Sequence, residues 1–569
     1  MNINKMENNN YDRKKYSDAI VLSKSKKKLI VAGPGTGKTF TFKQVMDSVS
    51  GNKIILTFIR KLVSEMKLNF NDSVEVKTFH ELCKGLLHKQ LGSFDIQPYL
   101  SEIVESDANI LGLKLTNFDE KFQNLDENTD EISFYLARSD YYKALSFNDS
   151  VYRFYKIALE NNNVLPNYDQ IIIDEYQDFN KLEVSLIEIL KEKGPILIAG
   201  DDDQAVYDTR SSSPTHIRAL YASGDYEFFE LPFCSRCPKV VVDLVNEIIL
   251  SAIKKGFFRD RVPKKYECYL PGKKDDSEKY PLATSVRLAN IAAISKYIHK
   301  EISLIDTQDI QDSYKDEGYP TSLIIGEKHL LKKIEPVLAK DFNIVHNLDN
   351  NSDYSIINAF QLLLKDDHSN LGWRLIADLF SIDLDILKVA VKKSTESDVK
   401  FHDFIPIDLS NNIKKCVELV RLISSKDTTK QEYLDELKQR IPLYSDGLID
   451  FFKPKENPEL IKIDETKPSV LLTTYVGSKG LSGGHVFILG MNNGCLPKNE
   501  KNIIDVEISK LIVALTRTRK KAYLVSNKWF LSPKNKYGGF DRAFDKSTFL
   551  SWISQKYLDD KGDLIAKDI

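Results

Sequence analysis

Short apolar runs recur along the chain, and segments with helical spacing separate several of them. Runs of this length, bounded by turn residues, are typical of strands that are buried in a parallel sheet. Helices between such strands indicate a doubly wound α/β architecture. The runs form one group before residue 235 and another after residue 320, so we expect two α/β cores. The expected strands are 29–32, 54–57, 171–173, 196–199, 323–325, 470–473, 486–489 and 522–525.

Two longer segments have a different pattern. Residues 82–160 and about 351–462 are rich in Leu, Lys, Asp and aromatic residues at helical spacing, which predicts helical insertions. Asn- and Lys-rich stretches at 1–15 and 347–353 are interpreted as a tail and a linker, although the same composition is ordinary in a low-GC genome.

Length and charge narrow the class of protein. A chain of 569 residues is too long for one hydrophobic core, and 42% hydrophobic with 28% charged residues is typical of globular proteins. Lys and Arg number 80 against 82 Asp and Glu, so any nucleic-acid site must be a local groove. The sequence has no run of about 18 apolar residues and no apolar export segment at its start, which favours a cytoplasmic protein that does not engage a membrane.

The cysteines are too sparse for a disulfide framework, and we expect reduced thiols. Cys234 and Cys237 form a C-x-x-C pair. A zinc or iron–sulfur site usually requires a second pair at similar spacing, and the sequence has none, so a metal at this pair is the less favoured interpretation.

The most specific chemical signal is a glycine-rich turn between an expected strand and an expected helix. The sequence is L-I-V-A-G-P-G-T-G-K-T. Ala32 stands where the common phosphate-loop pattern has its first glycine, a position that only opens the turn. Glycines let backbone N–H groups wrap a triphosphate, the lysine reaches the β and γ phosphates, and the final threonine ligates magnesium. The residues predicted to hold the nucleotide are Gly33, Pro34, Gly35, Thr36, Gly37, Lys38 and Thr39.

Carboxylates follow another expected strand, in the sequence I-I-I-D-E-Y-Q-D. The C-terminal ends of strands are where α/β sheets place ligands. Asp174 is predicted to hold magnesium through water, and Glu175 to act as the general base for hydrolysis of the γ-phosphate. Alone, the two carboxylates could belong to a solvated loop. Together with the phosphate loop they predict a Walker B site, and hence an ATPase that uses ATP and Mg²⁺.

Further motifs follow in the order of one known family. G-D-D-D-Q, which ends at Gln204, resembles motif III, and L-P-F-C-S-R-C, which contains Arg236, resembles motif IV. Residues 474–481 resemble motif V, and V-A-L-T-R, which ends at Arg517, resembles motif VI. Together with D-E-Y-Q-D, these segments make the chain similar to DNA helicases of the UvrD/Rep type in superfamily 1. The resemblance implies two RecA-like, doubly wound parallel-sheet cores of the P-loop NTPase class, with two mostly helical insertions.

The family's functional residues carry over where the motifs match. The resemblance implies that Gln204 senses the γ-phosphate, that Arg236 contacts phosphate, and that Arg517 is an arginine finger from the second core. Lys479 and Gly480 of motif V would also serve the nucleotide. A lone arginine on a helix is usually a surface ion-pair residue, so the role of Arg517 depends on the motif.

The family fold also implies a division of the chain into four domains. ATP would bind in a cleft between the two cores. Closing of this cleft on ATP, and its opening after hydrolysis, would shift the two cores along a DNA strand. The implied parts are 1–80 and 161–235 for domain 1A, 81–160 for the inserted domain 1B, 236–350 and 463–569 for domain 2A, and 351–462 for an inserted 2B-like domain.

The resemblance places DNA contacts on the face opposite the ATP cleft. Aromatic platforms with hydroxyl and amide contacts suit sequence-independent stacking on single strands. A phenylalanine that follows a strand can equally be a core residue. The residues predicted to contact DNA are Phe58 of motif Ia, Thr78, Phe79 and His80 of the next motif, and Tyr207 and Arg210 of motif III.

Several positions depart from the family pattern. No glutamine occurs near Tyr16, where the family recognises adenine, and Ser235 replaces an aromatic residue that stacks on the base. Thr209 replaces the tryptophan of motif III, and Val476 and Ser482 replace a histidine and a ribose-contacting glutamate of motif V. We therefore expect that the nucleotide specificity and the DNA contacts differ from those of the family. The predicted catalytic residues are all present.

Two functions stay open at this point. The first is a translocase or helicase on single-stranded or partly duplex DNA, with the family's 3′ to 5′ direction. The second is a regulatory ATPase that senses DNA ends or nucleotides and controls a partner. A P-loop ATPase unrelated to nucleic acid would leave D-E-Y-Q-D and G-D-D-D-Q unexplained. A looser resemblance, based on size and domain content, is to helicase-like subunits of anti-phage systems such as Gabija, and it implies a separate nuclease subunit as partner.

Overall fold

The computed structural model forms two compact units. Unit 1 comprises Met1–Leu82, Asn162–Leu348 and Ile463–Ile569, and it contains both large sheets. Unit 2 comprises Cys83–Asn161 and Asp349–Lys462 and is mostly helical. The structure describes residues 12–58, 63, 66–67, 70, 73–126, 129–207, 211–315, 318–345, 354–394, 399–425, 431–454, 464–530 and 543–564.

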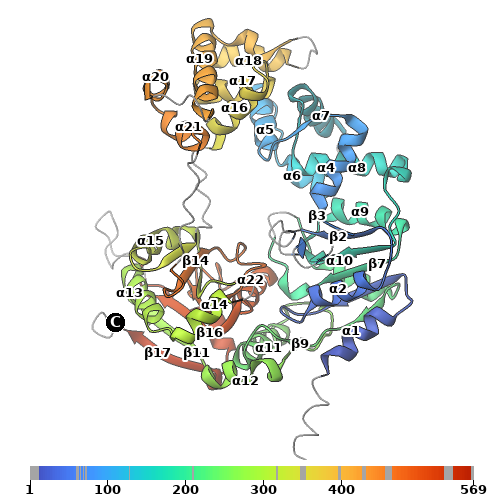
Figure 1. Ribbon diagram of the computed structural model, residues 1–569, viewed down its shortest axis with the longest axis vertical. Coiled ribbons are helices and arrows are strands. Elements are labelled where there is room, and N and C mark those ends of the chain that lie inside the picture. The colour runs from blue at the N-terminus through green and yellow to red at the C-terminus, as the bar shows by residue number, and fades with distance from the viewer. Residues whose placement is uncertain are drawn as a thin grey trace, which may run out of the picture. The chain divides into compact units, whose positions relative to one another are not determined.

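The first core of unit 1 is a six-stranded parallel sheet with strand order β3-β2-β6-β7-β1-β8. Its central strands are fully buried because their Ile- and Leu-rich runs are covered on both faces. Helices α1 (Arg13–Leu22) and α2 (Lys38–Asp47) pack on it through Ile20, Phe42 and Met46. The strands are β1 (Lys27–Val31), β2 (Lys53–Thr57), β3 (Val74–Thr78), β6 (Gln170–Ile173), β7 (Ile196–Gly200) and β8 (Glu227–Phe229), drawn in blue to green in Figure 1.

The remaining helices of this core lie between its strands. Helix α4 (Phe79–Leu91) follows β3 directly and crosses the boundary between the two units. Short 3-10 turns η2 (Tyr176–Asp178) and η4 (Asp202–Gln204) follow β6 and β7, and they precede α9 (Lys181–Leu190) and α10 (Thr215–Ser223).

The second core of unit 1 is a seven-stranded parallel sheet with strand order β13-β14-β12-β15-β16-β11-β17. One face packs against α11 (Lys239–Lys254) and α22 (Asp505–Leu515), and the other against α13 (Ile291–Ser303) and α15 (Lys328–Leu338). The strands are β11 (Ala283–Leu288), β12 (Ser322–Ile325), β13 (Asn343–Val345), β14 (Ser469–Thr473), β15 (Gly483–Leu489), β16 (Thr518–Asn527) and β17 (Leu558–Leu564).

Smaller elements of the second core complete unit 1. They are the short parallel pair β9 (Phe233–Cys234) and β10 (Glu267–Cys268), helices α12 (Leu270–Lys279) and α14 (Thr307–Tyr314), and the 3-10 turns η7 (Thr548–Trp552) and η8 (Gln555–Tyr557).

The predicted fold class is confirmed, and each expected strand lies in one of the two parallel sheets. One detail is wrong, because the second sheet does not start after residue 320. Strand β11 lies earlier in the chain, and it escaped the apolar-run criterion since its buried positions include Thr284 and Ser285. The division into domains 1A, 1B, 2A and 2B stays a prediction.

Unit 2 joins two helical segments that are about 200 residues apart in the sequence. Arg138 and Arg374 come from different segments, and both contact the carboxylate of Asp107, at 3.2 Å and 2.8 Å. All three side chains are fully buried. The helices are α5 (Leu100–Ile110), α6 (Phe118–Gln123), α7 (Thr129–Tyr142) and α8 (Phe147–Glu160) of the first segment, and α16 (Tyr354–Lys365), α17 (Asn370–Leu379), α18 (Leu384–Lys393), α19 (Ile407–Ser424), α20 (Gln431–Arg440) and α21 (Ser445–Phe452) of the second.

Within the described residues, none of the helices is both long and apolar enough to cross a lipid bilayer.

Candidate ATP site

Glycines shape the loop between β1 and α2. Gly35 and Gly37 have φ values of 72° and 93°, in the left-handed region that favours glycine. A Cβ at Gly35 would lie 2.6 Å from the Cβ of Arg236, so glycine allows the motif IV segment to approach the loop. Helix α2 begins at Lys38, and its free N–H groups therefore point toward the loop, as an anion site requires. The Lys38 Nζ lies over the same loop, where it donates to the carbonyl of Ala32 at 3.0 Å.

The predicted Walker B carboxylates lie at the C-terminal end of β6. Asp174 is buried, and its Oδ1 accepts a hydrogen bond from the N–H of Glu175 at 2.9 Å. Glu175 has a φ of 56°, an uncommon backbone conformation for a residue other than glycine. The Nε2 of Gln177 donates to Oε2 of Glu175 at 2.6 Å and so holds the Glu175 carboxylate in place. Such strain, of order 1–3 kcal/mol, persists where the surroundings fix it, often at functional sites.

The two carboxylates have opposite pKa shifts. Burial and the charge of Glu175 raise the pKa of Asp174, against the opposing charge of Lys38. Burial acts to raise the pKa of Glu175 as well, but the charges of Lys479 and Lys38 outweigh it, so that pKa is lowered. Of the two carboxylates, Glu175 is therefore the one whose ionised form its surroundings favour.

Asp174 and Thr39 fit a divalent cation. Both line the same cavity and offer hard oxygen ligands, which Mg²⁺ prefers. The ionised form of the Asp174 carboxylate is disfavoured here by burial and by Glu175, and a bound cation would favour it.

Gln204 of motif III connects the two cores. Its Nε2 donates to Asp201 Oδ2 at 2.7 Å, and its Oε1 accepts from Arg517 Nη2 at 3.0 Å. Its backbone carbonyl accepts from the Nζ of Lys479 at 2.9 Å. Arg517 and Lys479 belong to the second core, so Gln204 touches both predicted nucleotide motifs of that core.

Lys479 lines the nucleotide cavity but directs its ammonium to the first core. The Nζ lies 2.6 Å from Asp178 Oδ2 and 3.5 Å from Glu175 Oε2, and the side chain is 2% exposed. Burial alone would lower the pKa of Lys479, but the charges of Asp178 and Glu175 raise it. The adjacent Gly480 also lines the cavity, and its φ of 80° turns the chain at this point.

Two arginines, Arg236 and Arg517, line the cavity together. Arg517 is buried, with Nε donating to the carbonyl of Val513 and Nη1 to that of Leu481. Arg236 donates from Nη1 to the carbonyl of Thr516 at 3.4 Å. Burial and the charge of Arg236 lower the pKa of Arg517. An anion between the two guanidinium groups would relieve this repulsion, as a phosphate would.

These residues surround one cavity of about 1220 Å³ in unit 1. That volume is large enough for a nucleotide with a bound cation. Of the residues predicted for catalysis, nucleotide and metal, the cavity is lined by Pro34, Gly35, Thr36, Gly37, Lys38, Thr39, Asp174, Glu175, Gln204, Arg236, Lys479, Gly480 and Arg517. Gly33 lies behind the loop, where a Cβ would be 2.5 Å from the ring of Tyr266.

The residues predicted to contact DNA divide into surface and core. Phe58 and Tyr207 are half-buried, and their ring centroids lie 5.3 Å apart. Phe79 is a core residue instead, because its fully buried ring packs against Phe179 and has no face free for a base. Thr78 is also buried, and its Oγ1 caps α4 by accepting from the N–H of Glu81.

The other two predicted DNA residues have different outcomes. His80 is half-buried, with Nε2 3.7 Å from Glu183 Oε1. Arg210 lies outside the described residues, as does Thr209.

The departures from the family pattern have local roles. Ser235 donates from its N–H and its hydroxyl to the carbonyl of Gly35, at 2.9 Å and 3.2 Å, which ties motif IV to the phosphate loop. Ser482 accepts from Arg519 at 2.9 Å. The ring of Tyr16 packs edge-on against Phe233, with centroids 6.0 Å apart.

The possible metal groups have simpler explanations. Cys234 and Cys237 are buried in the core of the second sheet, and Cys234 lies in register with Cys268 across β9 and β10. In the described part of the chain, the one group of three clustered His, Cys, Asp or Glu ligands is Asp201–Asp203, and the ammonium of Lys264 lies among these carboxylates.

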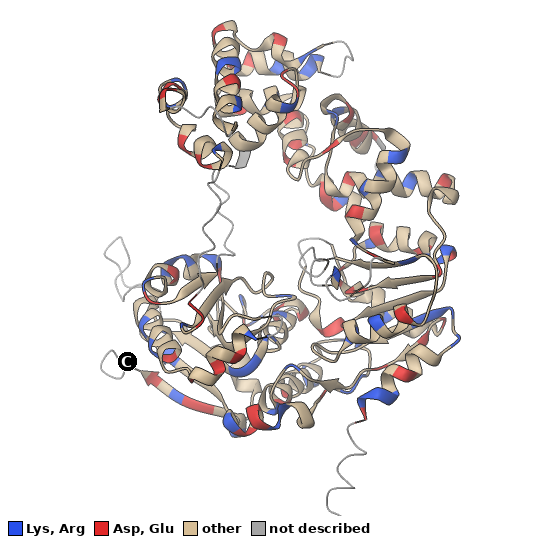
Figure 2. Cartoon of the chain, viewed as in Figure 1, with Lys and Arg blue, Asp and Glu red and all other residues tan. Residues whose placement is uncertain are grey.

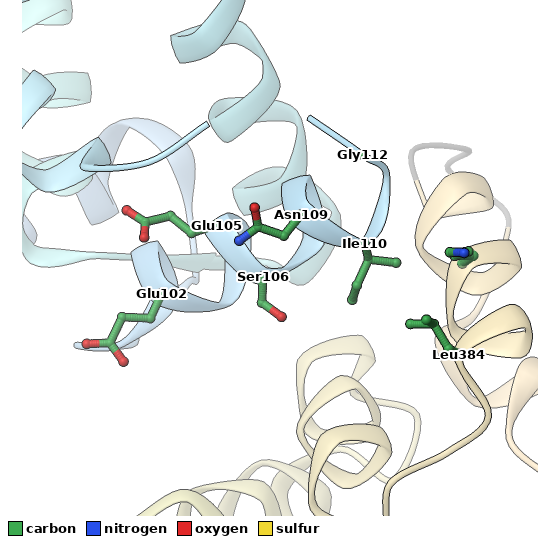
Figure 3. Close-up of a pocket in the computed structure, with 8 residues that line it drawn as sticks. Glu102, Glu105, Ser106, Asn109, Ile110, Gly112 and Leu384 are labelled. Carbon is green, nitrogen blue, oxygen red and sulfur yellow. The ribbon is translucent and has the colours of Figure 1, made fainter. Parts of the chain in front are cut away.

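An open hollow of about 670 Å³ in unit 2 has a different lining. Figure 3 shows Glu102, Glu105 and Asn109 on α5, with Ile110 at the end of that helix across from Leu384 of α18. This lining lacks a phosphate loop and contains none of the predicted site residues, so the cavity of unit 1 is the candidate ATP site.

Three site residues were not predicted from the sequence. Gln177 and Asp178 lie inside D-E-Y-Q-D, so closer attention to that motif could have found them. Lys264 carries no sequence signal, because a lysine in a polar loop is usually solvated.

Comparisons with known proteins agree with this geometry. Residues 17–210 match the family model described as AAA domain. The ATP-dependent DNA helicase Rep of Buchnera aphidicola subsp. Schizaphis graminum is 22% identical, over 87% of this chain and 90% of that protein. The probable DNA helicase II homolog of Mycoplasma capricolum is 24% identical, over 89% of this chain and 83% of that protein. The ATP-dependent DNA helicase PcrA of Leuconostoc citreum is 22% identical, over 93% and 83%.

Over most of its length, the chain is similar to UvrD/Rep-like DNA helicases of superfamily 1. The matched relatives cover 87% and 93% of this chain, so the similarity is not confined to the phosphate loop. The chain is a P-loop ATPase with two parallel-sheet cores, and the cavity that is the candidate ATP site is lined by residues of both cores.

Proposed function

We propose that this UvrD/Rep-like protein is an ATP-dependent translocase that moves along single-stranded DNA and opens partly duplex DNA. The observation that carries the proposal is the contact of Gln204 with Arg517 and Lys479, which joins the two cores at the nucleotide cavity. Contacts of this kind let the state of the nucleotide control the distance between the cores. The 3′ to 5′ direction is taken from the family resemblance.

The chemistry of hydrolysis follows from the residues that line the cavity. The triphosphate would lie on the N-terminus of α2, with Lys38 on its β and γ phosphates. Thr39 and Asp174 would hold Mg²⁺, which when bound neutralises phosphate charge and orients the γ-phosphate. Glu175, kept ionised by Lys479 and Lys38, would orient the attacking water and accept its proton.

The arginines would act on the charge that develops during transfer. Arg236 and Arg517 line the same cavity as Lys38, and both keep their hydrogen bonds to backbone carbonyls. Preorganised donors of this kind need little reorganisation when charge develops on the phosphoryl group. Arg517 would exchange its bond with Gln204 for one with the γ-phosphate, which makes it the proposed arginine finger.

The DNA strand would contact the aromatic pair of the first core. Phe58 and Tyr207 are half-buried neighbours, so one ring face can stack on a base while the other stays packed. The net charge of −2 and the mixture of basic and acidic residues along the helices in Figure 2 favour a local groove over an extended basic surface.

A regulatory ATPase that controls a separate nuclease subunit is the second candidate. The burial of Thr78 and Phe79 favours it, since fewer of the predicted DNA contacts are accessible than in the family pattern. ATP turnover with and without single-stranded DNA, followed by strand displacement on a duplex with a 3′ single-stranded extension, separates the two. Stimulated turnover with displacement supports the motor. Turnover that responds only to a partner protein supports the regulatory module.

A further inference from the structure

Lys264 is a buried cation inside the motif III turn. It lies in the loop between α11 and β10, and its side chain is 2% exposed. Its Nζ lies 2.9 Å from Asp201, 2.5 Å from Asp202 and 2.8 Å from Asp203. A lysine with three carboxylate partners uses all three of its N–H donors.

The cluster is balanced in charge. Asp202 also accepts from Arg218 at 3.0 Å, and Asp203 accepts two hydrogen bonds from Arg261, at 2.7 Å and 2.8 Å. Three carboxylates are thus matched by three cations. Burying three adjacent anions without such partners would cost several kcal/mol for each ion. Of these three cations, Lys264 is the one that reaches Asp201.

Asp201 is the member of the cluster that touches the proposed catalytic residues. Its Oδ2 accepts from the Nε2 of Gln204, and its backbone N–H donates to the side-chain oxygen of Gln177 at 2.9 Å. Gln177 in turn donates to Glu175. Since the Nε2 of Gln204 is directed to Asp201, its Oε1 faces Arg517. The position of Asp201 therefore fixes both the γ-phosphate sensor and the carboxylate that orients water.

We propose that Lys264 is a positioning residue for ATP hydrolysis, because its ammonium holds Asp201 so that Gln204 and Glu175 face the γ-phosphate. The inference depends on the proposed ATPase function. Lys264 is too deeply enclosed among the carboxylates to touch ATP itself. Its substitution should therefore change the rate of hydrolysis and not the affinity for nucleotide.

The test compares two substitutions in the same cluster. Lys264→Met removes the cation at Asp201, whereas Arg218→Met removes a cation that contacts Asp202 and the carbonyl of Arg259. Steady-state ATP turnover gives kcat, and titration with a fluorescent ADP analogue gives the dissociation constant. We expect Lys264→Met to lower kcat by about 10-fold to 100-fold while nucleotide affinity changes by no more than about twofold. Arg218→Met should keep kcat close to that of the parent protein.

Asp201→Asn tests the contact between Lys264 and Asp201 by changing the carboxylate instead of the ammonium. It keeps the shape of the side chain and leaves Lys264 paired with Asp202 and Asp203, so it provides a folded variant if Lys264→Met does not fold. A fall in kcat like that of Lys264→Met supports the inference. Parent-like kcat in Asp201→Asn or in folded Lys264→Met overturns it, as does an equal fall in Arg218→Met. A parent protein that hydrolyses no ATP would instead refute the proposed function.

Discussion

Single residues in the cavity have separable tasks because each touches a different part of the proposed reaction. Lys38 lies over the phosphate loop. Glu175 follows the C-terminal end of β6, where its carboxylate contacts Gln177 and Lys479. One side chain would bind phosphate in the ground state, and the other would act only when water attacks. Substitutions at the two positions should therefore change different kinetic constants.

Lys38→Ala should abolish hydrolysis and weaken nucleotide binding, because it removes a phosphate contact. Glu175→Gln should bind ATP and leave it uncleaved, since the amide keeps the shape of the side chain but cannot accept the proton. Nucleotide titration and a single-turnover hydrolysis assay check both variants. A Glu175→Gln protein that cleaves ATP at the parent rate would show that Glu175 does not act on the water.

Arg517→Ala should lower turnover by about a thousandfold while ATP affinity changes little, because an arginine finger acts on the charge of the transition state. The measurement is kcat beside the dissociation constant for a nucleotide that is not hydrolysed. Arg517 also bonds the carbonyls of Val513 and Leu481. Losses of similar size in affinity and in turnover would therefore indicate that its main task is to hold motif VI in place.

At the scale of elements, the two helical segments of unit 2 are joined by buried charge. Asp107 of α5 pairs with Arg138 of α7 and with Arg374 of α17, which comes from the other inserted segment. Arg138 also donates to the carbonyl of Val391 in α18 and to the hydroxyl of Ser394, which follows that helix. These contacts indicate that the two segments fold and move as one body.

Asp107→Ala should destabilise unit 2 by about 3–5 kcal/mol, because it removes the buried carboxylate that the guanidinium groups of Arg138 and Arg374 share. Asp378→Ala is the matched control. Asp378 also pairs with Arg374, but its side chain is 43% exposed, so we expect a loss of about 1 kcal/mol or less. Hydrogen exchange of peptides from α5, α7 and α17 measures the change. Equal exchange in the two variants would show that the buried network does not stabilise the unit.

The sequence predicted best those features that depend on local order along the chain. The phosphate loop and the D-E-Y-Q-D segment could be located because their residues act through fixed spacing beside a strand. Phe79 could not be assigned, since a ring after a strand has the same local pattern in a core and on a surface. Lys264 and Asp201 meet only through the tertiary fold. Strand β11 was missed because buried Thr and Ser interrupt its apolar run.

For the whole molecule, a translocase needs a route by which bound DNA affects the ATP site, and Gln204 is the proposed route. The aromatic pair Phe58 and Tyr207 lies in the first core, and Lys479 lies 5.6 Å from the ring of Tyr207 while it also bonds Gln204. A DNA strand that displaces Tyr207 would therefore act on Lys479, which contacts Glu175, the proposed general base. DNA that binds the hydrolysis-competent form of the cleft more tightly would increase the population of that form and so raise turnover.

The most direct measurement is ATP turnover by the full chain, titrated with unstructured single-stranded DNA of increasing length at low salt. We predict a several-fold rise in turnover that saturates with DNA concentration and weakens as salt is added, because counterions compete for the phosphates. Turnover that is unchanged by strands of every length, in a protein that does hydrolyse ATP, would contradict the translocase and leave the regulatory ATPase in its place.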